Sequence, residues 1–355
     1  MPTKEYNKVN ISNKKHTFVI AEAGSNWKIG KYEDDLKQAK ELIKVAATSG
    51  ADAVKFQTFK AETLYSENAG VSDYLSRQGM EQQINDIFEY LSMPYEMIPE
   101  LADYCKKEKI LFMSTPFSVP DAKQIDPFVD IHKVASYEIN HVRLLEYLAQ
   151  TKKPILVSTG ASTYSDIDFA VDLIRQNGNH AIGLLQCTAK YPAPLESLNL
   201  ATIPEIKSRY GVDVGLSDHS MDPVIAPILA IGLGATVIEK HFTLDKKLPG
   251  PDHKFALVPS ELELMIKSIR MADIAKGINN KKILDEEIEL ANFAKRSIQA
   301  TTKISKGEIL QEGKNFDILR PGTRKKGLSP KFLTSISGKR AKTDIEAGDG
   351  ILEYE

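Results

Sequence analysis

The chain has little cysteine and no long apolar run. Its cysteines, Cys105 and Cys187, lie in apolar stretches, so we expect two buried thiols rather than a disulfide, as is usual in a reducing cytosol. No uninterrupted apolar stretch is long enough to cross a bilayer, and the polar residues 1–16 lack the apolar core of a secretory signal. These absences argue against exported and membrane-bound proteins, and we expect a cytoplasmic protein.

The chain also lacks an excess of charge of either sign. It has 46 basic and 48 acidic residues, which give a net charge of −2. This balance argues against nucleic acid as a partner, and any anionic ligand must be held by local positive groups. An apolar content of 42% over 355 residues is ample for burial, and the length indicates one large barrel-type domain with a smaller second domain.

Short apolar strands alternate with amphipathic helices over most of the chain. Helical patterns such as Tyr32–Ser49, Ser165–Asn177 and Ser260–Ala275 lie between the strands. Eight strands in about 250 residues are what an α/β fold of the (β/α)8 TIM-barrel type requires, although periodicity alone does not distinguish a closed barrel from an open doubly wound sheet. The predicted strands are Phe18–Glu22, Ala53–Gln57, Ile110–Ser114, Ile131–Ser136, Pro154–Ser158, Ala181–Cys187, Val212–Ser217 and Thr236–Glu239.

One connection in this pattern is irregular. The segment from Thr58 to Lys109 contains polar, glycine-bearing sequence before two helical stretches, DIFEYLSM and PYEMIPELADYCKKEK. A loop of this length on the functional face is often part of a binding site, and as often a surface excursion.

In a barrel, the residues at the carboxyl ends of the strands face the active site. Hydroxyls, amides and two lysines at these positions suit a phosphate or carboxylate, whereas carboxylates and imidazoles suit a metal and proton transfer. Alternatively, the serines and threonines cap the helices that follow. The strand-end residues are Glu22, Lys55, Gln57, Ser114, Thr115, Lys133, Ser136, Ser158, Thr159, Gln186, Thr188, His219, Glu239 and His241.

Two of these residues are histidines that follow successive strands. Because the carboxyl ends of adjacent parallel strands lie close together, one divalent cation could bind both His219 and His241. A single histidine at a strand end is more often a hydrogen-bonded loop residue. The pair, flanked by Asp218 and Glu239, favours a metal site.

The composition changes after the last helical pattern. Residues 281–296 are charged and weakly apolar, as in a linker, although DEEIELANF could form a helix; residues 297–355 hold short β-like runs between turns. We therefore expect a polar lead at 1–16, a barrel at 17–280, a linker at 281–296 and a mostly-β module at 297–355. Two halves of this module share a pattern, in which Ala300, Thr302, Ile304 and Gly307 match Ala341, Thr343, Ile345 and Gly348.

A set of motifs runs along the whole chain after the polar lead. They are FVIAEAGSN, GADAVKFQTF, FMSTPF, KVASYE, ILVSTG, LLQCTAKYPAP, VGLSDHS, GATVIEKHFTLDK and PGPDH, followed by RPG in the terminal module. Together these motifs resemble the sialic acid synthases, a family that includes the legionaminic and pseudaminic acid synthases and the spore-coat polysaccharide synthase.

The resemblance implies a (β/α)8 barrel joined to an antifreeze-like, β-clip SAF domain, in a domain-swapped homodimer whose SAF domain caps the partner's barrel. It implies condensation of phosphoenolpyruvate with the open-chain aldehyde of an N-acetylated hexosamine, either N-acetylmannosamine or a 2,4-diacetamido-trideoxyhexose. The products would be a nonulosonic (sialic-type) acid and phosphate. The implied cofactor is Mn²⁺, with Mg²⁺ or Co²⁺ as alternatives.

The resemblance also implies roles for individual side chains. His219 and His241 would ligate the ion, and Arg320 in RPG would reach an N-acyl group across the dimer. Glu22, Glu138 and Glu239 would be the catalytic carboxylates. The remaining substrate-binding residues would be Lys55, Gln57, Thr115, Lys133, Ser136, Ser158, Tyr191 and Asp252.

These roles agree with the chemistry of the strand ends. A metal would polarise the aldehyde oxygen, while lysines and hydroxyls would neutralise the phosphate and carboxylate. We hypothesise that Glu22 or Glu239 orients or deprotonates the water that quenches the oxocarbenium centre.

The chain departs from the family pattern in three places. Asn26-Trp27 stands where many members have Asn-His, and Ala189 stands where the sialic acid enzymes have an Asn that contacts substrate. ASYE replaces the more frequent SGE, which removes a glycine beside Ser136. KVASYEINH and TAKYPAP are shared with the spore-coat relatives, whereas PGPDH favours the sialic or legionaminic branch over the pseudaminic one. The acceptor sugar stays open.

Three other functions compete with this prediction. A Schiff-base aldolase would use Lys55, Lys133 or Lys240 as its nucleophile. A non-catalytic sugar-binding or ice-binding protein would be built around the terminal module, and would need no metal site. A hydrolase that uses residues 217–219, Ser-Asp-His, is disfavoured because residues adjacent in sequence at one strand end do not form a relay.

Overall fold

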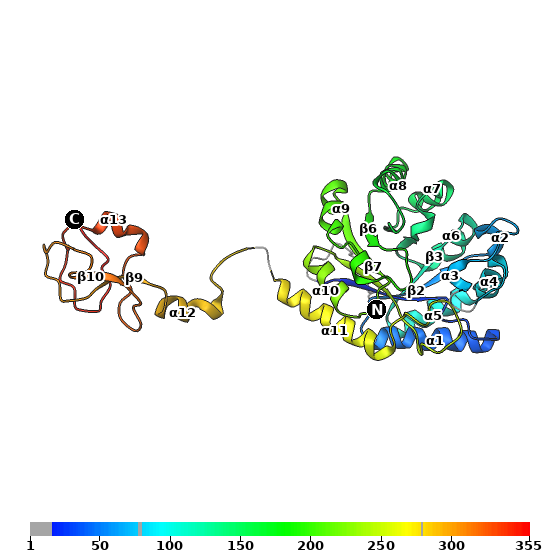
Figure 1. Ribbon diagram of the computed structural model, residues 1–355, viewed down its shortest axis with the longest axis horizontal. Coiled ribbons are helices and arrows are strands. Elements are labelled where there is room, and N and C mark those ends of the chain that lie inside the picture. The colour runs from blue at the N-terminus through cyan, green and yellow to red at the C-terminus, as the bar shows by residue number, and fades with distance from the viewer. Residues whose placement is uncertain (1–15, 77–79, 278–279) are drawn as a thin grey trace, which may run out of the picture. The chain divides into compact units, whose positions relative to one another are not determined.

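The computed structural model describes residues 16–76, 80–277 and 280–355. The chain divides into two compact units after Gly277, and each unit is described by itself. Apart from His16, the predicted polar lead lies outside the described residues. In Figure 1, colours from blue to yellow mark the first unit, and the second unit runs on to red.

The first unit is built on one sheet of parallel strands. The strands pair in the order β3-β2-β1-β8-β7-β6-β5-β4, and β3 and β4, the two ends of this order, contact each other. The sheet therefore curves into a closed barrel, and the TIM-barrel prediction is confirmed over the open doubly wound alternative. The strands are β1 Phe18–Gly24, β2 Ala53–Thr58, β3 Leu111–Pro116, β4 His132–Val134, β5 Ile155–Ser158, β6 Ile182–Cys187, β7 Asp213–Asp218 and β8 Val237–His241.

Helices connect the strands and surround the barrel (Figure 1). The helices predicted at Tyr32–Ser49, Ser165–Asn177 and Ser260–Ala275 are observed within one residue of their predicted bounds. The capping box at the start of α8 shows a local signal at work, because the Thr163 hydroxyl accepts from the backbone of Asp166, whose carboxylate accepts from the backbone of Thr163. The helices are α1 Tyr32–Thr48, α5 Met97–Glu108, α6 Val119–Ile125, α7 Val142–Gln150, α8 Tyr164–Gln176, α9 Thr202–Tyr210, α10 Ile225–Gly232 and α11 Pro259–Lys276.

The long connection between β2 and β3 has a small core of its own. It contains α2 Ala61–Leu64, α3 Asp73–Ser76 and α4 Ile84–Leu91 before α5 begins. Phe59, Leu75 of α3 and three apolar side chains of α4 bury one another in a cluster separate from the main core. This segment is therefore a folded excursion over the described part of its length.

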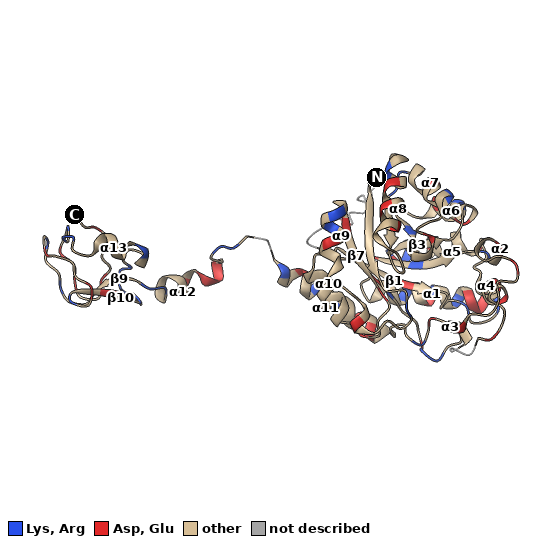
Figure 2. Ribbon diagram, turned by 45° about the horizontal axis from the view of Figure 1, so that its top comes forward, with Lys and Arg blue, Asp and Glu red and all other residues tan. Residues whose placement is uncertain are grey.

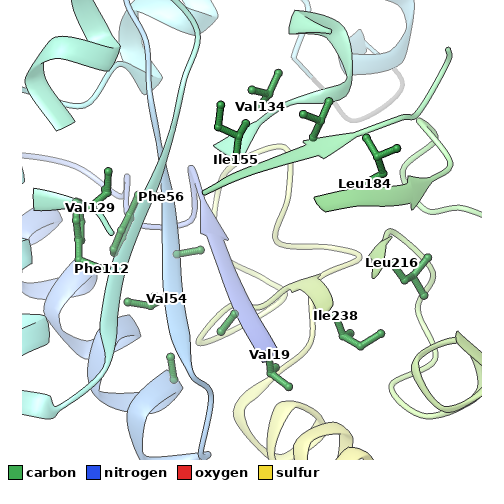
Figure 3. Packing of buried hydrophobic residues seen from close by; sticks show 14 of the residues in the cluster. Val19, Val54, Phe56, Phe112, Val129, Val134, Ile155, Leu184, Leu216 and Ile238 are labelled. Carbon is green, nitrogen blue, oxygen red and sulfur yellow. The ribbon is translucent and has the colours of Figure 1, made fainter. Parts of the chain in front are cut away.

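The strands alternate between two apolar surfaces. Side chains on the outer face pack against the helices (Figure 3), and they include Val19, Val54, Phe112, Leu184, Leu216 and Ile238. Side chains one residue away point into the barrel and fill its interior toward the amino ends of the strands. They include Phe18, Ile20, Ala53, Met113, Leu156 and Val237. Because both faces are buried, the strands read as continuous apolar runs rather than alternating ones.

Charges of both signs lie along the surrounding helices, such as α1, α9 and α11 (Figure 2). This mixture agrees with the balanced composition of the chain. Among the described residues, no helix is both long enough and apolar enough to cross a bilayer.

The second unit begins with a short helix in the predicted linker, α12 Ile288–Phe293. β9 Ser297–Ala300 pairs antiparallel with β10 Phe316–Leu319, and α13 Leu333–Ile336 lies between the later turns. Apolar side chains from the whole unit form one core, among them Ile298, Leu310, Phe316, Ile336 and Ile351.

The repeat read from the sequence is also a structural repeat. Ile304 and Ile345 exchange two backbone hydrogen bonds of 2.9 Å each, so the two halves pair through matching residues. Gly307 donates to Ala341 over 2.7 Å, and Gly348 donates to Ala300 over 2.8 Å. The second bond repeats the first with the halves exchanged, as expected for two hairpin-like halves related by a local twofold.

Candidate active site

The site begins two residues beyond the apolar layer inside the barrel. Along each of four strands, the next inward-facing position after an apolar side chain carries a charge, because inward residues recur with a period of two. All four charged side chains are at least 94% buried, and they are Glu22, Lys55, Lys133 and Glu239. Inside the barrel, a layer of charged side chains therefore lies next to the apolar layer, on the side of the carboxyl ends of the strands.

Lys55 links the two carboxylates of this layer. Its Nζ lies 2.6 Å from Glu22 Oε2 and 3.6 Å from Glu239 Oε1, and it donates to Thr115 Oγ1 over 2.8 Å. Gln57 also donates to Glu22, over 3.2 Å. The ammonium and the hydroxyl together are suited to form one half of an anion pocket.

Lys133 would form the other half of such an anion pocket. Its Nζ donates to Ser158 Oγ over 2.7 Å and to the Val134 carbonyl over 2.9 Å, and it lies 4.0 Å from Glu239 Oε1. Ser136, in the 3₁₀ turn after β4, accepts from the backbone N–H of Gly160 over 2.9 Å. Two ammonium groups and three hydroxyls therefore converge from β2, β3, β4, the turn after β4, and β5.

The two carboxylates of the layer have opposite pKa shifts. Burial raises the pKa of Glu22 to about 7, although Lys55 opposes the shift. Burial also acts to raise the pKa of Glu239, but Lys133 and Lys55 outweigh it and hold that pKa below its ordinary value. Environments that separate two neighbouring carboxyl pKa values are typical of acid–base sites.

The pKa values of the two lysines, Lys55 and Lys133, are also shifted in opposite directions. Burial acts to lower the pKa of Lys55, but Glu22 and Glu239 outweigh it and raise that pKa. For Lys133, burial prevails over the attraction of Glu239, and its pKa is lowered. An additional anion near Lys133 would therefore favour the charged ammonium.

Two imidazoles lie beside the charged layer. The rings of His219 and His241 have their centroids 5.5 Å apart. His219 Nδ1 lies 2.8 Å from the Thr188 carbonyl, so this nitrogen carries the proton and Nε2 is the one that can accept. His241 Nδ1 is buried with no hydrogen-bond partner, and Asp252 Oδ2 lies 3.7 Å from it.

Aromatic rings enclose this histidine pair. Tyr191 lies against His219 with ring centroids 4.1 Å apart, and Phe255 lies 5.2 Å from His241. Tyr191 and Phe255 also contact each other, at 5.4 Å between centroids. This packing limits the rotamers that both imidazoles can adopt.

The donor set fits an ion with open coordination positions. Among residues 16–76, 80–277 and 280–355, no group of three or more His, Cys, Asp or Glu side chains is arranged to hold a metal. Two imidazoles at the observed separation, one with an unpartnered buried nitrogen, can still bind one divalent cation. Water or substrate oxygens would then complete its coordination.

The structure brings most of the predicted site residues to one cavity. Its lining includes Glu22, Lys55, Gln57, Thr115, Lys133, Ser136, Ser158, Tyr191, His219, Glu239 and His241, together with Ala135, Cys187 and Ser217.

Three predicted residues lie elsewhere. Asp252 lies beside His241 without lining the cavity, and Glu138 is buried in the 3₁₀ turn after β4. Burial raises the pKa of Glu138 to about 7, and its Oε2 has no hydrogen-bond partner. Arg320 belongs to the second unit, where it is exposed.

Several strand-end assignments were wrong by one residue. Gln186 donates to the Leu198 carbonyl, and Thr188 donates to the Ser197 carbonyl, so neither lines the cavity. Cys187, which faces the same way as Leu185, lines the cavity in their place. Its thiol lies 3.8 Å from His219 Nδ1, and the period of two along β6 could have identified it.

Two further strand-end residues are used for packing. Ser114 shares a 2.7 Å hydrogen bond with Thr58 on the outer side of the sheet. Thr159 donates to the Leu185 carbonyl over 3.0 Å, so its hydroxyl joins neighbouring strands. Phe255 was missed because it lies in an irregular segment after β8, where no periodicity reports its direction.

Two of the competing functions lose candidate residues. Lys240 faces away from the cavity and bonds Asp218, so it is not available as a Schiff-base nucleophile there. Ser217 donates to Glu239 rather than to His219, and Asp218 is occupied by Lys240. The hydrolase relay is therefore absent among these residues.

A closed parallel barrel whose strand ends carry converging lysines, carboxylates and imidazoles is an enzyme of the TIM-barrel class. Comparison with known proteins specifies the class further. The chain belongs to the NeuB family, whose model matches residues 42–281, and a SAF domain model matches residues 295–353.

The most similar relatives include synthases of acidic sugars. The spore coat polysaccharide biosynthesis protein SpsE of Bacillus subtilis is 42% identical, and the match covers 94% of this chain and 92% of that protein. A pseudaminic acid synthase of Campylobacter jejuni is 36% identical over 98% of both chains. The N,N'-diacetyllegionaminic acid synthase of Legionella pneumophila is 35% identical over 94% of this chain and 93% of its own.

Solved structures show the same architecture. The Bacillus subtilis SpsE structure matches with a TM-score of 0.63 at 40% identity, covering 95% of this chain and 94% of its own. An N-acetylneuraminic acid synthetase from Leptospira borgpetersenii, in complex with citrate, matches with a TM-score of 0.69 at 30% identity, covering 79% and 92%.

Proposed function

We propose that this enzyme condenses phosphoenolpyruvate with the open-chain aldehyde of an N-acetylated hexosamine, giving a nonulosonic acid and phosphate. The observation that carries the proposal is the convergence of Lys55 and Lys133, each bonded to a strand-end hydroxyl, on a cavity that the histidine pair also lines. Membership of a family with named nonulosonic acid synthases supports the same reaction.

The lysine side of the cavity would hold phosphoenolpyruvate. Lys55 and Lys133 are now balanced by Glu22 and Glu239, so an incoming phosphate and carboxylate would compete for the same ammonium groups. The thiol of Cys187 and the hydroxyls of Ser136 and Ser217 line the cavity beside them.

The histidine side would hold the aldehyde end of the acceptor. His219 and His241 would bind a divalent ion, for which we propose Mn²⁺, and when bound the ion would polarise the aldehyde oxygen. Tyr191 and Phe255 hold both imidazoles in place and exclude water from their faces. Asp252, whose Oδ2 lies 3.7 Å from His241 Nδ1, would accept a hydrogen bond from a sugar hydroxyl at the edge of the cavity.

The reaction balances with one water molecule. C3 of phosphoenolpyruvate forms a bond to the aldehyde carbon, whose oxygen takes a proton, and water adds to the electron-poor C2. Glu22 accepts one proton of this water, which balances the proton taken by the aldehyde oxygen; the C2–O bond to phosphate then breaks as the carbonyl forms, and the second water proton leaves with the phosphate. Gln57 and Lys55 orient the Glu22 carboxylate for this step, because both bond it.

The direct test is acceptor-dependent release of phosphate from phosphoenolpyruvate. A panel of N-acetylmannosamine and 2,4-diacetamido-trideoxyhexoses would be assayed with Mn²⁺, with EDTA, and with EDTA followed by excess Mn²⁺. We expect release with at least one acceptor, its loss in EDTA and its return with the metal. Release without any acceptor, or undiminished release in EDTA, would contradict the proposal.

The aldolase alternative makes a different prediction. Lys55 has its pKa raised by two carboxylates, which disfavours the neutral amine that a Schiff base requires, and Lys133 is the remaining candidate in the cavity. Borohydride reduction in the presence of pyruvate would trap a pyruvyl lysine in an aldolase. We expect no such adduct by mass spectrometry.

We also propose that the enzyme is a homodimer in which Arg320 of one subunit approaches the acceptor bound by the other. Five exposed apolar side chains in and before α12 support an interface there, and they are Ile283, Leu284, Ile288, Leu290 and Phe293. Light scattering would give the mass of the wild type and of Leu290→Glu. A monomeric wild type would contradict the dimer without affecting the barrel chemistry.

A further inference from the structure

Lys240 is a buried charge that the proposed reaction does not use. It lies between Glu239 and His241 on β8, faces away from the cavity and is 2% exposed. Its Nζ lies 2.5 Å from Asp218 Oδ2 and donates to the Ser220 carbonyl over 2.6 Å and to Ser220 Oγ over 3.2 Å. Asp218 and Ser220 are the two residues on either side of His219.

The two imidazoles are not held equally well by the backbone. His241 is inside the sheet, opposite Glu22 of β1, and its carbonyl accepts from Leu257 over 2.9 Å. The pairing of β7 with β8 ends at Asp218 opposite Lys240, one residue before His219. The sheet therefore places His241, whereas other contacts must place His219.

Lys240 provides the contact that bridges the two histidines. It joins the residue before His241 to the residues on both sides of His219. Asp218 adds rigidity, because its Oδ1 accepts from the Ser220 backbone over 2.8 Å and closes the turn around His219. His219 is also held from a different element, because its imidazole Nδ1 donates to the Thr188 carbonyl and its backbone carbonyl accepts from the Ala193 N–H.

A purely structural role would not require a charge at this position. The neighbouring outward residues Leu216 and Ile238 are apolar and pack under the helices. Replacing a buried ion pair by apolar residues is often neutral or stabilising, so its presence next to both histidines calls for another reason.

We infer that Lys240 is a positioning residue, whose bonds to Asp218 and Ser220 hold His219 at the distance from His241 at which both rings can bind one divalent cation. This inference rests on the proposed function, in which the two imidazoles share an ion.

The test compares four proteins by direct Mn²⁺ titration, in which electron paramagnetic resonance reports free Mn²⁺. We expect Lys240→Met to weaken Mn²⁺ binding roughly 10–100-fold, as loss of an outer-shell partner does at other metal sites. Phosphoenolpyruvate affinity, measured without metal, should change less than about twofold, because the inner-face lysines are untouched.

The matched control is Lys153→Met at the opposite end of the barrel. Lys153 also bonds one aspartate, Asp126, through its carboxylate at 2.9 Å and through its backbone carbonyl, but it precedes β5 and lies at the amino end of the strands. We expect this variant to lose thermal stability and keep Mn²⁺ affinity. An equal loss of affinity in Lys153→Met would overturn the inference.

A double variant separates positioning from stability. Lys240→Met leaves Asp218 as a buried, uncompensated carboxylate, whereas Lys240→Met with Asp218→Asn removes the net charge and keeps the oxygen that accepts from Ser220. We expect the double variant to recover thermal stability and to stay deficient in Mn²⁺ binding. Recovery of both properties together would show a structural role only and would overturn the inference.

A crystal structure of the double variant provides the readout that does not depend on metal. The inference requires His219 to move, so that the separation of the ring centroids departs from 5.5 Å. An unchanged histidine pair would overturn it. If the wild type binds no Mn²⁺, the proposed metal dependence fails. The position of His219 in the crystal structure of the double variant still decides whether Lys240 is a positioning residue.

Discussion

The charged side chains at the two ends of the barrel bond different kinds of partner. At the amino end, Asp52 accepts from the Val19 backbone over 2.8 Å and from Arg270 of α11 over 2.8 Å, and Asp273 accepts from both the backbone and the hydroxyl of Thr17. At the carboxyl end, Lys55 and Lys133 share carboxylates whose pKa values are shifted in opposite directions.

The difference lies in what the charges bond. The amino-end carboxylates satisfy backbone N–H groups where β1 begins, so they connect α11 to the sheet and stabilise the fold. The carboxyl-end charges bond one another and strand-end hydroxyls, and Glu239 Oε2 is left without a partner. In TIM barrels the amino end serves stability and the carboxyl end serves catalysis, and the following changes test this division here.

The largest expected effect is on activity, from Lys133→Met. Loss of the ammonium removes the group that Ser158 and Glu239 share, and the rate of phosphate release should fall about 10³-fold or more. Because burial already lowers the pKa of Lys133, we expect little loss of thermal stability. Activity within tenfold of the wild type would place the anion pocket elsewhere.

The next effect is on turnover, from Glu22→Gln. If Glu22 accepts the water proton, kcat should fall about 10²-fold while the affinity for phosphoenolpyruvate stays nearly intact. The pKa of Glu22 is raised to about 7, so the wild-type rate should increase as pH rises through about 7, where the carboxyl ionises. This limb of the pH profile should disappear in the variant.

Glu138→Gln is the control for this assignment, since burial raises the pKa of Glu138 to about 7 as well. It should retain the limb, because Glu138 does not line the cavity. Loss of the limb in Glu138→Gln alone would transfer the role of base to Glu138.

Arg270→Met should have the reverse effect at the amino end. The variant loses the bond to Asp52 and the bond to the Thr17 carbonyl, which together are worth about 2 kcal/mol or somewhat more. Calorimetry should show a Tm lower by several degrees, and kcat should be unchanged. A drop in kcat without a drop in Tm would contradict the division between the two ends.

A smaller effect concerns stability at the carboxyl end. The folded-state pKa of Glu22 is above its ordinary value of 4.5, so the folded protein holds this proton more tightly than the unfolded chain does. The favourable contribution of this proton to the free energy of unfolding is fully present below pH 4.5 and is lost as pH rises through about 7. Glu22→Gln should therefore be more stable than the wild type at pH 8 and equal to it near pH 4, by denaturant unfolding.

The smallest effect should come from Cys187→Ser. The thiol lines the cavity but lies 3.8 Å from His219 Nδ1, whereas the Thr188 carbonyl holds the same nitrogen at 2.8 Å. We expect kcat within about threefold of the wild type, since a hydroxyl can replace a weak thiol contact. A larger loss would assign Cys187 a direct contact with substrate.

Hydrophobic periodicity was sufficient to locate the strands and helices of the barrel, but not to show that the sheet closes. Alternating strands and helices predicted all eight strands within two residues of their observed bounds, and the repeat in the terminal module predicted two similar halves. The hydrophobic pattern and the repeat can both be recognised in short stretches of sequence, because burial on two faces and turn residues leave their pattern within a single element.

The direction of side chains at the strand ends was predicted less well. Lys55, Lys133 and Glu239 were identified as inward-facing, but Gln186 and Thr188 were assigned to the cavity in place of Cys187. Polar residue types at strand ends attract a functional assignment, whereas the pleat decides direction, and a shift of one residue reverses it.

By itself, the sequence determined where strands and helices form and which chemical groups reach the carboxyl ends, because periodicity and residue type are properties of the chain. Only the tertiary structure decided which of these groups meet. Closure of the barrel brings Lys133 of β4 within 4.0 Å of Glu239 of β8, and the β7–β8 ladder ends one residue before His219, where Lys240 bonds the residues on both sides of it. Distances across a closed sheet depend on register and shear, which no local segment encodes.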